Sequence, residues 1–203
     1  MHSYPVPRQA QTLVEETIKK SRFITYIVHT AGIEAAKNVV QAIRAQHPTA
    51  RHHCWAFVAG APNDSQQLGF SDDGEPSGTA GKPMLAQLMG SGLGEVTAVV
   101  VRYYGGVMLG TGGLVKAYGG GVQSALKQVE RQIKVPKNAY WLHCQYAQLA
   151  EIERIIQRFQ GDLLDTHFTE QVTVYIALPE AFLAECNEAL SQFSRGELHL
   201  QQQ

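Results

Sequence analysis

The sequence is poor in cysteine, in long apolar runs and in net charge. Its cysteines, Cys54, Cys144 and Cys186, lie far apart and form no CxxC pair, which argues against a disulfide framework and fits a reducing cytosol. No apolar stretch approaches the ~20 residues that a membrane-spanning helix needs. The polar residues 1–11 also lack the apolar segment of a secretory signal. These absences predict a cytoplasmic protein with no membrane partner.

The net charge of -1 hides an uneven distribution of charges along the chain. Residues 1–136 contain 13 Lys and Arg against 9 Asp and Glu, a balance of +4. Residues 137–203 contain 4 against 9, a balance of -5. We therefore expect a polyanion to bind the first part of the chain, with an affinity that is weak and strongly salt-dependent.

A glycine-dense run from Gly94 to Gly121 is the most unusual feature that is present. It begins with the apolar, β-branched residues 96–101, which are typical of a strand buried on both faces. After several glycines, apolar residues recur at helical spacing from Leu114 to Ala125. The glycines at 119–121 would each weaken that helix by roughly 1 kcal/mol. Close packing against a sheet or against a ligand must offset this cost.

Periodicity elsewhere in the first part predicts a mixed fold. Strands are expected at residues 12–18, 22–29 and 52–59, with helices at 33–46 and from 84 to 89. The intervening residues 60–83 are rich in glycine, proline, serine and acids, which predicts a long loop with a short strand near 68–70. A long ordered loop in a compact domain is more often functional than incidental.

The second part has a clear alternating pattern after a predicted linker at residues 134–138. The expected elements are a strand, a helix, two strands around a turn near Glu170, a helix and a strand, at residues 140–146, 149–159, 163–169, 172–178, 182–193 and 197–200. This βαββαβ order is that of a ferredoxin-like domain. The sequence thus predicts an α+β protein with domains at residues 1–134 and 135–203.

Three segments resemble the signature of the IMPACT family. They are Arg102–Gly110 after the valine-rich strand, Asp72–Pro76, and Gly78–Pro83. The resemblance implies a two-layer α/β first domain similar to the second domain of a small-subunit ribosomal protein and to domain four of elongation factor G. It implies a second domain similar to domain five of that factor. Eukaryotic relatives regulate translation initiation under amino-acid starvation by interfering with a stress-response kinase, partly through an additional N-terminal domain.

The first segment combines a cation with two stacking surfaces, which suits nucleic acid, although one tyrosine could equally be core. Backbone amides near Gly78 and Gly81 could form an anion nest beside Lys82, or simply a structured turn. A phosphate-binding P-loop is excluded, because Pro76 and Pro83 occupy positions that this motif needs for other residues. The candidates for nucleic-acid or anion binding are Arg102, Tyr103, Tyr104, Gly105, Gly106, Gly110, Lys116, Gly78, Gly81 and Lys82.

Two further groups could ligate a metal. Asp72, Asp73 and Glu75 offer the oxygen ligands that Mg2+ prefers, but the same residues could form a solvated acidic turn that acts as a cap or pairs with Arg102 or Lys82. His52–Cys54 would alternate across a strand and cannot all reach one ion. We assign no metal, no cofactor and no catalytic residue.

Three functions remain open at this point. The first is a non-enzymatic regulator associated with translation, which binds RNA, the ribosome or a protein partner through residues 102–116 and 72–82. The second is a phosphate-ligand enzyme for phosphoryl transfer or hydrolysis, with Asp72 or Asp73 as its base. The third is an interaction or dimerisation module formed by the second domain, with the oligomeric state left open.

Overall fold

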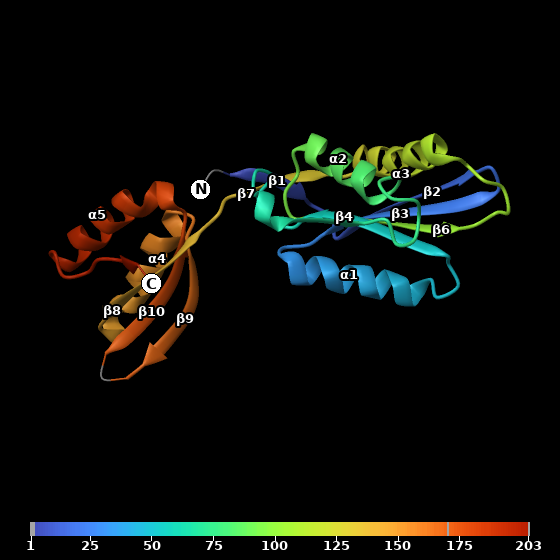
Figure 1. Ribbon diagram of the computed structural model, residues 1–203. Helices are drawn as coiled ribbons and strands as arrows, with labels where there is room; N and C mark the ends of the chain where they lie inside the picture. Colours follow the sequence, from blue (N-terminus) through green and yellow to red (C-terminus); the bar gives the residue numbers. More distant parts are fainter. Residues whose placement is uncertain (1–2, 170, 203) are drawn as a thin grey trace. The chain divides into compact units, whose positions relative to one another are not determined.

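The computed structural model describes residues 3–169 and 171–202. The chain forms two compact units (Figure 1). Residues 4–134 form the first unit, and residues 135–202 form the second together with Ser3. The turn expected near Glu170 lies outside the described residues. Within the described part, no helix is long and apolar enough to cross a membrane.

The first unit is built on one antiparallel sheet of five strands among the described residues, in the order β2-β3-β6-β4-β5. These strands are β2 (Gln11–Ile18), β3 (Ser21–His29), β6 (Val96–Tyr103), β4 (His52–Val58) and β5 (Leu68–Ser71). The valine-rich β6 lies at the centre, where residues 96–101 are buried as their composition predicts. The β2–β3 hairpin is also confirmed.

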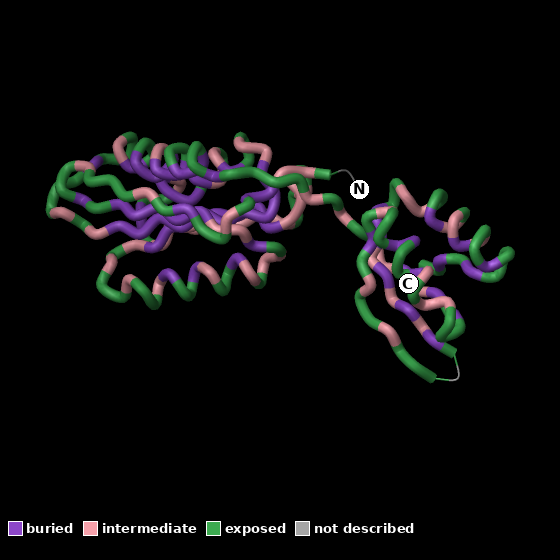
Figure 2. The backbone as a smooth tube through the Cα atoms, turned by 180° about the vertical axis from the view of Figure 1, so that it is seen from behind, coloured by how far each residue is buried: buried purple, intermediate pink, exposed green. Residues whose placement is uncertain are grey.

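Helices cover both faces of this sheet (Figure 1). Alternate residues of β6 divide between them, because Val100 packs in the core beneath α2 (Gly81–Ser91) and α3 (Thr111–Leu126), whereas Val99 and Val101 pack with α1 (Ile33–Gln46). Figure 2 shows the buried residues concentrated in the sheet between the helices. The unit therefore has three layers, one more than the two-layer arrangement that the family resemblance implies.

Close packing accounts for part of the glycine content of α3. A Cβ atom on Gly121 would lie 2.6 Å from Thr25 Oγ1 of β3, and one on Gly119 would lie 3.6 Å from Pro83 Cβ of α2. A Cβ atom on Gly120 would have no neighbour within 4 Å. Packing thus requires a small residue at 121. A Cβ atom at 119 would make an ordinary van der Waals contact and one at 120 would have free space around it, so packing does not require glycine at those two positions.

Two short strands were not expected from the sequence. β1 (Tyr4–Pro7) pairs with β7 (Arg131–Lys134) in a separate small sheet. The ends of the first unit are thereby joined, and only residues 135–137 lie between β7 and the next strand. Sequence patterns do not indicate either strand, because β1 contains prolines and β7 contains charged residues, and neither strand has the run of β-branched residues that is typical of a strand.

The second unit consists of β8 (Asn138–Cys144), α4 (Leu149–Arg158), β9 (Asp162–Phe168), β10 (Val172–Leu178), α5 (Leu183–Ser194) and β11 (Gln201–Gln202). Short 3-10 turns lie at Ser65–Gln67 in the first unit and at Tyr146–Gln148 and Glu180–Phe182 in the second. The sheet order β11-β8-β10-β9 confirms the ferredoxin-like arrangement. The last strand begins at Gln201, after the expected range, and the backbone amides of Leu198 and Leu200 instead donate hydrogen bonds to Ser194 and Asn187 of α5.

Candidate nucleic-acid interface

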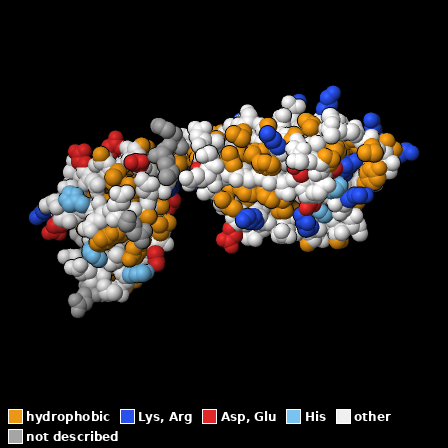
Figure 3. Space-filling view, viewed as in Figure 1, with side chains coloured by type: hydrophobic (Ala, Val, Ile, Leu, Met, Phe, Trp, Pro, Cys, Tyr) orange, Lys and Arg blue, Asp and Glu red, His pale blue; other side chains and the backbone are white. Residues whose placement is uncertain are grey.

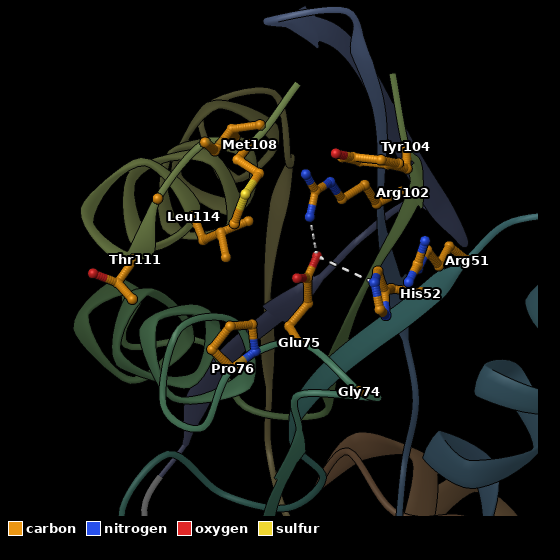
Figure 4. Close-up of a pocket in the computed structure, with 12 residues that line it drawn as sticks. Arg51, His52, Gly74, Glu75, Pro76, Arg102, Tyr104, Met108, Thr111 and Leu114 are labelled. Atoms are coloured by element: carbon orange, nitrogen blue, oxygen red, sulfur yellow. Dashed lines mark hydrogen bonds and ion pairs between the residues drawn. The ribbon is translucent and has the colours of Figure 1, made fainter. Parts of the chain in front are cut away.

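A cavity of about 400 Å³ lies in the first unit where β4 and β6 meet the loops that precede α2 and α3. Its lining combines polar side chains with an apolar wall, namely Arg51, His52, Glu75, Arg102, Tyr104 and Thr111 with Pro76, Met108, Leu109 and Leu114. Two predicted segments, 72–76 and 102–110, therefore meet at one site. In Figure 4, Met108 and Leu114 approach from one side, and Arg102, Tyr104 and His52 approach from the other.

A buried ion pair forms the floor of this cavity. Glu75 Oε1 accepts hydrogen bonds from Arg102 Nη1 and Tyr118 Oη, each at 2.6 Å. Arg102 Nη2 also donates to Ser21 Oγ at 3.3 Å. Arg102 is 5% exposed and Glu75 is 8% exposed. Because water does not reach these side chains, each charged group is stabilised by the other. Arg102 is thus a structural partner of Glu75, and it does not offer the exposed cation that its sequence position suggested.

The second carboxylate oxygen of Glu75 faces the cavity. Glu75 Oε2 accepts no hydrogen bond from any residue that the structure describes, and Figure 4 shows it directed away from Arg102, on the side of Leu114. His52 lies on the opposite side, with its Nε2 3.9 Å from Glu75 Oε1. Its Nδ1 donates to the carbonyl oxygen of Asp73 at 2.8 Å, which fixes the ring. The cavity therefore contains one carboxylate oxygen able to accept a hydrogen bond from a ligand.

The three residues of the predicted cation and stacking motif do not act together. Tyr103 points to the α1 face of the sheet, where its hydroxyl lies 2.7 Å from His47 Nδ1. Tyr104 is 43% exposed at the cavity, with the guanidinium carbons of Arg51 and Arg102 5.6 Å and 5.4 Å from its ring centre. Strand alternation separates the two tyrosines, and Arg51 supplies the exposed cation beside Tyr104.

The three acidic candidates each have a different partner. Asp72 accepts hydrogen bonds from the amides of Gly78, Ala80 and Gly81 at 2.8–3.0 Å, and so caps α2. Burial raises the pKa of Asp72, but these amide bonds outweigh it and hold the pKa below its ordinary value. The amides of the predicted anion nest are therefore already bound to a carboxylate of the chain.

Asp73 binds elsewhere, since its carboxylate accepts from Arg44 at 2.9 Å and from the amide of His53 at 2.7 Å. Because Asp72, Asp73 and Glu75 turn to separate partners, they do not converge on one point. No group of three or more His, Cys, Asp or Glu side chains placed to hold a metal ion occurs among the described residues. In the structure this segment therefore forms a turn in which Asp72 caps a helix and Asp73 and Glu75 pair with arginines. It differs from the expected solvated turn in that Glu75 is buried.

A second concavity, a groove of about 540 Å³, lies between α2 and α3. Both predicted lysines line it, with Lys82 on α2 and Lys116 on α3, together with Gly78, Gly119 and Gly120. The groove is adjacent to the cavity, because Thr111 and Leu114 of α3 line the cavity and the next two residues, Val115 and Lys116, line the groove. The candidates Gly78, Lys82 and Lys116 are thereby brought together.

The glycines of the loop before α3 mainly shape it. A Cβ atom on Gly105 would lie 2.0 Å from the carbonyl group of Lys20, so the loop can pack on the β2–β3 turn only with glycine there. Gly106 and Gly110 have φ angles of 81° and 74°, which few other residues adopt. Gly110 also lines the cavity.

Known proteins match the whole chain. The Impact N-terminal domain matches residues 19–126, and a domain of unknown function, DUF1949, matches residues 142–197. The chain is 60% identical to the IMPACT family member YigZ of Escherichia coli (strain K12), covering 98% of both chains. It is 52% identical to an IMPACT family member of Haemophilus influenzae, covering 99% of this chain and 97% of the relative. A crystal structure of a hypothetical protein is 59% identical, with a TM-score of 0.83 over 100% of this chain and 98% of the other.

Proposed function

The chain belongs to the IMPACT family, and from this premise we propose that it is a non-enzymatic regulator associated with translation that binds single-stranded segments of RNA through its first unit. The association with translation rests on the family resemblance. The choice of RNA rests on the side chains at the mouth of the cavity.

The observation that carries the proposal is the composition of the cavity mouth. The exposed Arg51 lies beside the Tyr104 ring, and Met108, which is 81% exposed, faces them across the opening. Proteins bind single-stranded RNA with this combination, in which aromatic and apolar surfaces contact bases and cations contact phosphates. Tyr104 and Met108 both line the cavity and are both exposed, and an apolar surface at the mouth of a concavity is typical of a binding site.

The groove beside the cavity provides a path for the RNA backbone. Lys82 and Lys116 are exposed, and they flank a stretch where Gly119 and Gly120 leave the helix surface low. On the face shown in Figure 3, Lys and Arg side chains lie beside apolar ones over the first unit. All 13 of the Lys and Arg residues counted before residue 136 fall in this unit, whose balance is +4.

An enzyme for phosphoryl transfer or hydrolysis has less support. Asp72 and Asp73, its possible bases, are both held by backbone amides, and Asp73 also pairs with Arg44. Cys54 is fully buried, and burial raises the pKa of its thiol, which disfavours the nucleophilic thiolate. The dimerisation role of the second unit stays a prediction.

The proposal is tested by fluorescence anisotropy of the full chain with a single-stranded RNA of about ten nucleotides, a length that spans a typical small binding groove. Affinity is expected to fall steeply between about 50 mM and about 200 mM salt. Arg51→Ala should weaken binding and reduce the salt slope by about 0.7, the value for one lost phosphate contact. The matched control is Arg8→Ala, which removes one exposed cation of the same unit away from the cavity. No binding at low salt, or equal losses in the two variants, would contradict the proposal.

A further inference from the structure

We propose that the cavity above Glu75 binds one unpaired nucleobase that carries an exocyclic amino group, in preference to uracil. This inference rests on the proposed RNA binding and adds the chemistry that the cavity selects.

The size and walls of the cavity suit a single base. Its volume of about 400 Å³ lies at the small end of ligand pockets, which holds a nucleoside but not a folded structure. Met108 and Leu114 form one wall, and Tyr104 forms the other above the buried pair of Glu75 and Arg102 (Figure 4). A flat ring can lie between an apolar wall and an aromatic side chain, an arrangement that RNA-binding proteins use for unstacked bases.

Glu75 determines which edge of the base fits. Its Oε1 is committed to Arg102 and Tyr118, whereas Oε2 is free of hydrogen bonds from the described residues and faces the cavity. A carboxylate only accepts hydrogen bonds, so the ligand must supply a donor. The amino groups of cytosine, adenine and guanine are such donors, and acidic side chains accept from the cytosine amino group in other nucleic-acid complexes.

Uracil is disfavoured by the same oxygen. Its ring N–H lies between two carbonyl oxygens, and one of these would lie close to the Glu75 carboxylate, where like partial charges repel. The same repulsion keeps a phosphate group out of the cavity floor. Arg51 at the mouth gives the phosphate a partner outside, so the base enters the cavity and the backbone stays at its rim.

The decisive experiment compares oligo(C) and oligo(U) of equal length, which have the same backbone charge and ring size. The two bases differ along one edge, where cytosine has an amino group beside an unprotonated ring nitrogen and uracil has a carbonyl group beside a ring N–H. The full chain should bind oligo(C) about tenfold more tightly, the value of one hydrogen bond to a charged group. Equal affinities, with RNA binding intact, would overturn the base assignment and leave the proposed function standing. Absence of binding to both would overturn both.

The Glu75→Gln variant tests the role of the carboxylate itself. Arg102 Nη1 and Tyr118 Oη are both donors, so the amide oxygen of the glutamine must take the Oε1 position and its NH2 group must face the cavity. The variant should therefore lose or reverse the preference for oligo(C), because it now offers a donor to the uracil carbonyl. An unchanged preference for oligo(C) would overturn the proposal, and thermal unfolding of the variant shows whether the fold is kept.

A second pair of variants keeps the proposal falsifiable if Glu75→Gln fails to fold. Met108→Glu places a negative charge at the exposed mouth of the cavity, and Met89→Glu makes the same change on α2 at a residue that lines neither concavity. Met108→Glu should weaken oligo(C) binding at least tenfold, since it removes an apolar wall and repels phosphate. Met89→Glu should change it less than twofold. Equal effects would show that the cavity is not the site.

Discussion

Glu75 Oε1 and Arg102 Nη1 lie 2.6 Å apart in the interior of the first unit and join two of the three segments that resemble the family signature, 72–76 and 102–110. The pair explains why these distant segments share one site. It also gives the first prediction, because a buried ion pair that loses one member leaves the other without compensation.

Arg102→Ala should lower the free energy of unfolding by about 3–5 kcal/mol, the usual cost of an orphaned buried charge. Denaturation in urea measures the change. Arg22→Ala is the control, since Arg22 pairs with Glu15 on the surface and its loss should alter stability little. If the two variants lost equal stability, the buried pair would not have the structural role assigned to it.

Substitution of two neighbouring glycines in α3 should have opposite effects. Gly120→Ala should stabilise the unit by about 0.5–1 kcal/mol, because it meets nothing within 4 Å and alanine favours helix. Gly121→Ala should destabilise it by about 1–3 kcal/mol, because its Cβ atom would lie 2.6 Å from Thr25 Oγ1 in the core. The midpoint of thermal unfolding of each variant, compared with that of the unmodified protein, tests this prediction. A shift of both midpoints in the same direction would contradict the packing of α3 on the sheet.

Acid should destabilise the first unit in part through Asp72. The pKa of Asp72 is lower in the folded chain than its ordinary value, so its contribution to stability is present above a pH of about 4 and is lost as the pH falls through the folded pKa. Asp72→Asn should therefore flatten the fall in urea midpoint between about pH 6 and about pH 3. Glu16→Gln, at an exposed position of β2, should leave that fall unchanged.

The three cysteines should react slowly in the native protein. All are buried, and burial raises the pKa of Cys186 to about 11 and also raises those of Cys54 and Cys144. A thiol-reactive dye should label fewer than one equivalent in native conditions and all three in denaturant. Rapid native labelling of Cys54 would contradict its assigned burial and reopen a nucleophilic role.

The sequence predicted the elements better than the site. The buried strand at 96–101, the helix after the glycine run and the βαββαβ order all follow from periodicity, which depends on nearby residues alone. The partner of Glu75 depends on a contact between residues 27 positions apart. The sequence offered Arg102 and Lys82 as possible partners of the acidic segment, and only the fold shows that Glu75 pairs with Arg102.

Sequence patterns wrongly placed Arg102 and Tyr103 on a binding surface, also because such patterns do not show tertiary contacts. Residue type suggested an exposed cation with two stacking rings, but alternation along β6 sends Tyr103 to the α1 face and Arg102 into the interior. Arg51 and Met108 become part of the site through tertiary packing. Met108 lies inside the predicted segment 102–116, and the sequence also allows Arg51 to extend a basic face, but a single sequence does not show that the two residues meet at one cavity.

The most direct test of the central claim is amide chemical-shift mapping of the full chain titrated with oligo(C). The account predicts that shifts concentrate around the cavity and groove, at residues such as Arg51, Glu75, Gly110, Thr111 and Lys116, while residues 138–168 stay unchanged. Shifts confined to the second unit, or the absence of any shift at low salt, would contradict it.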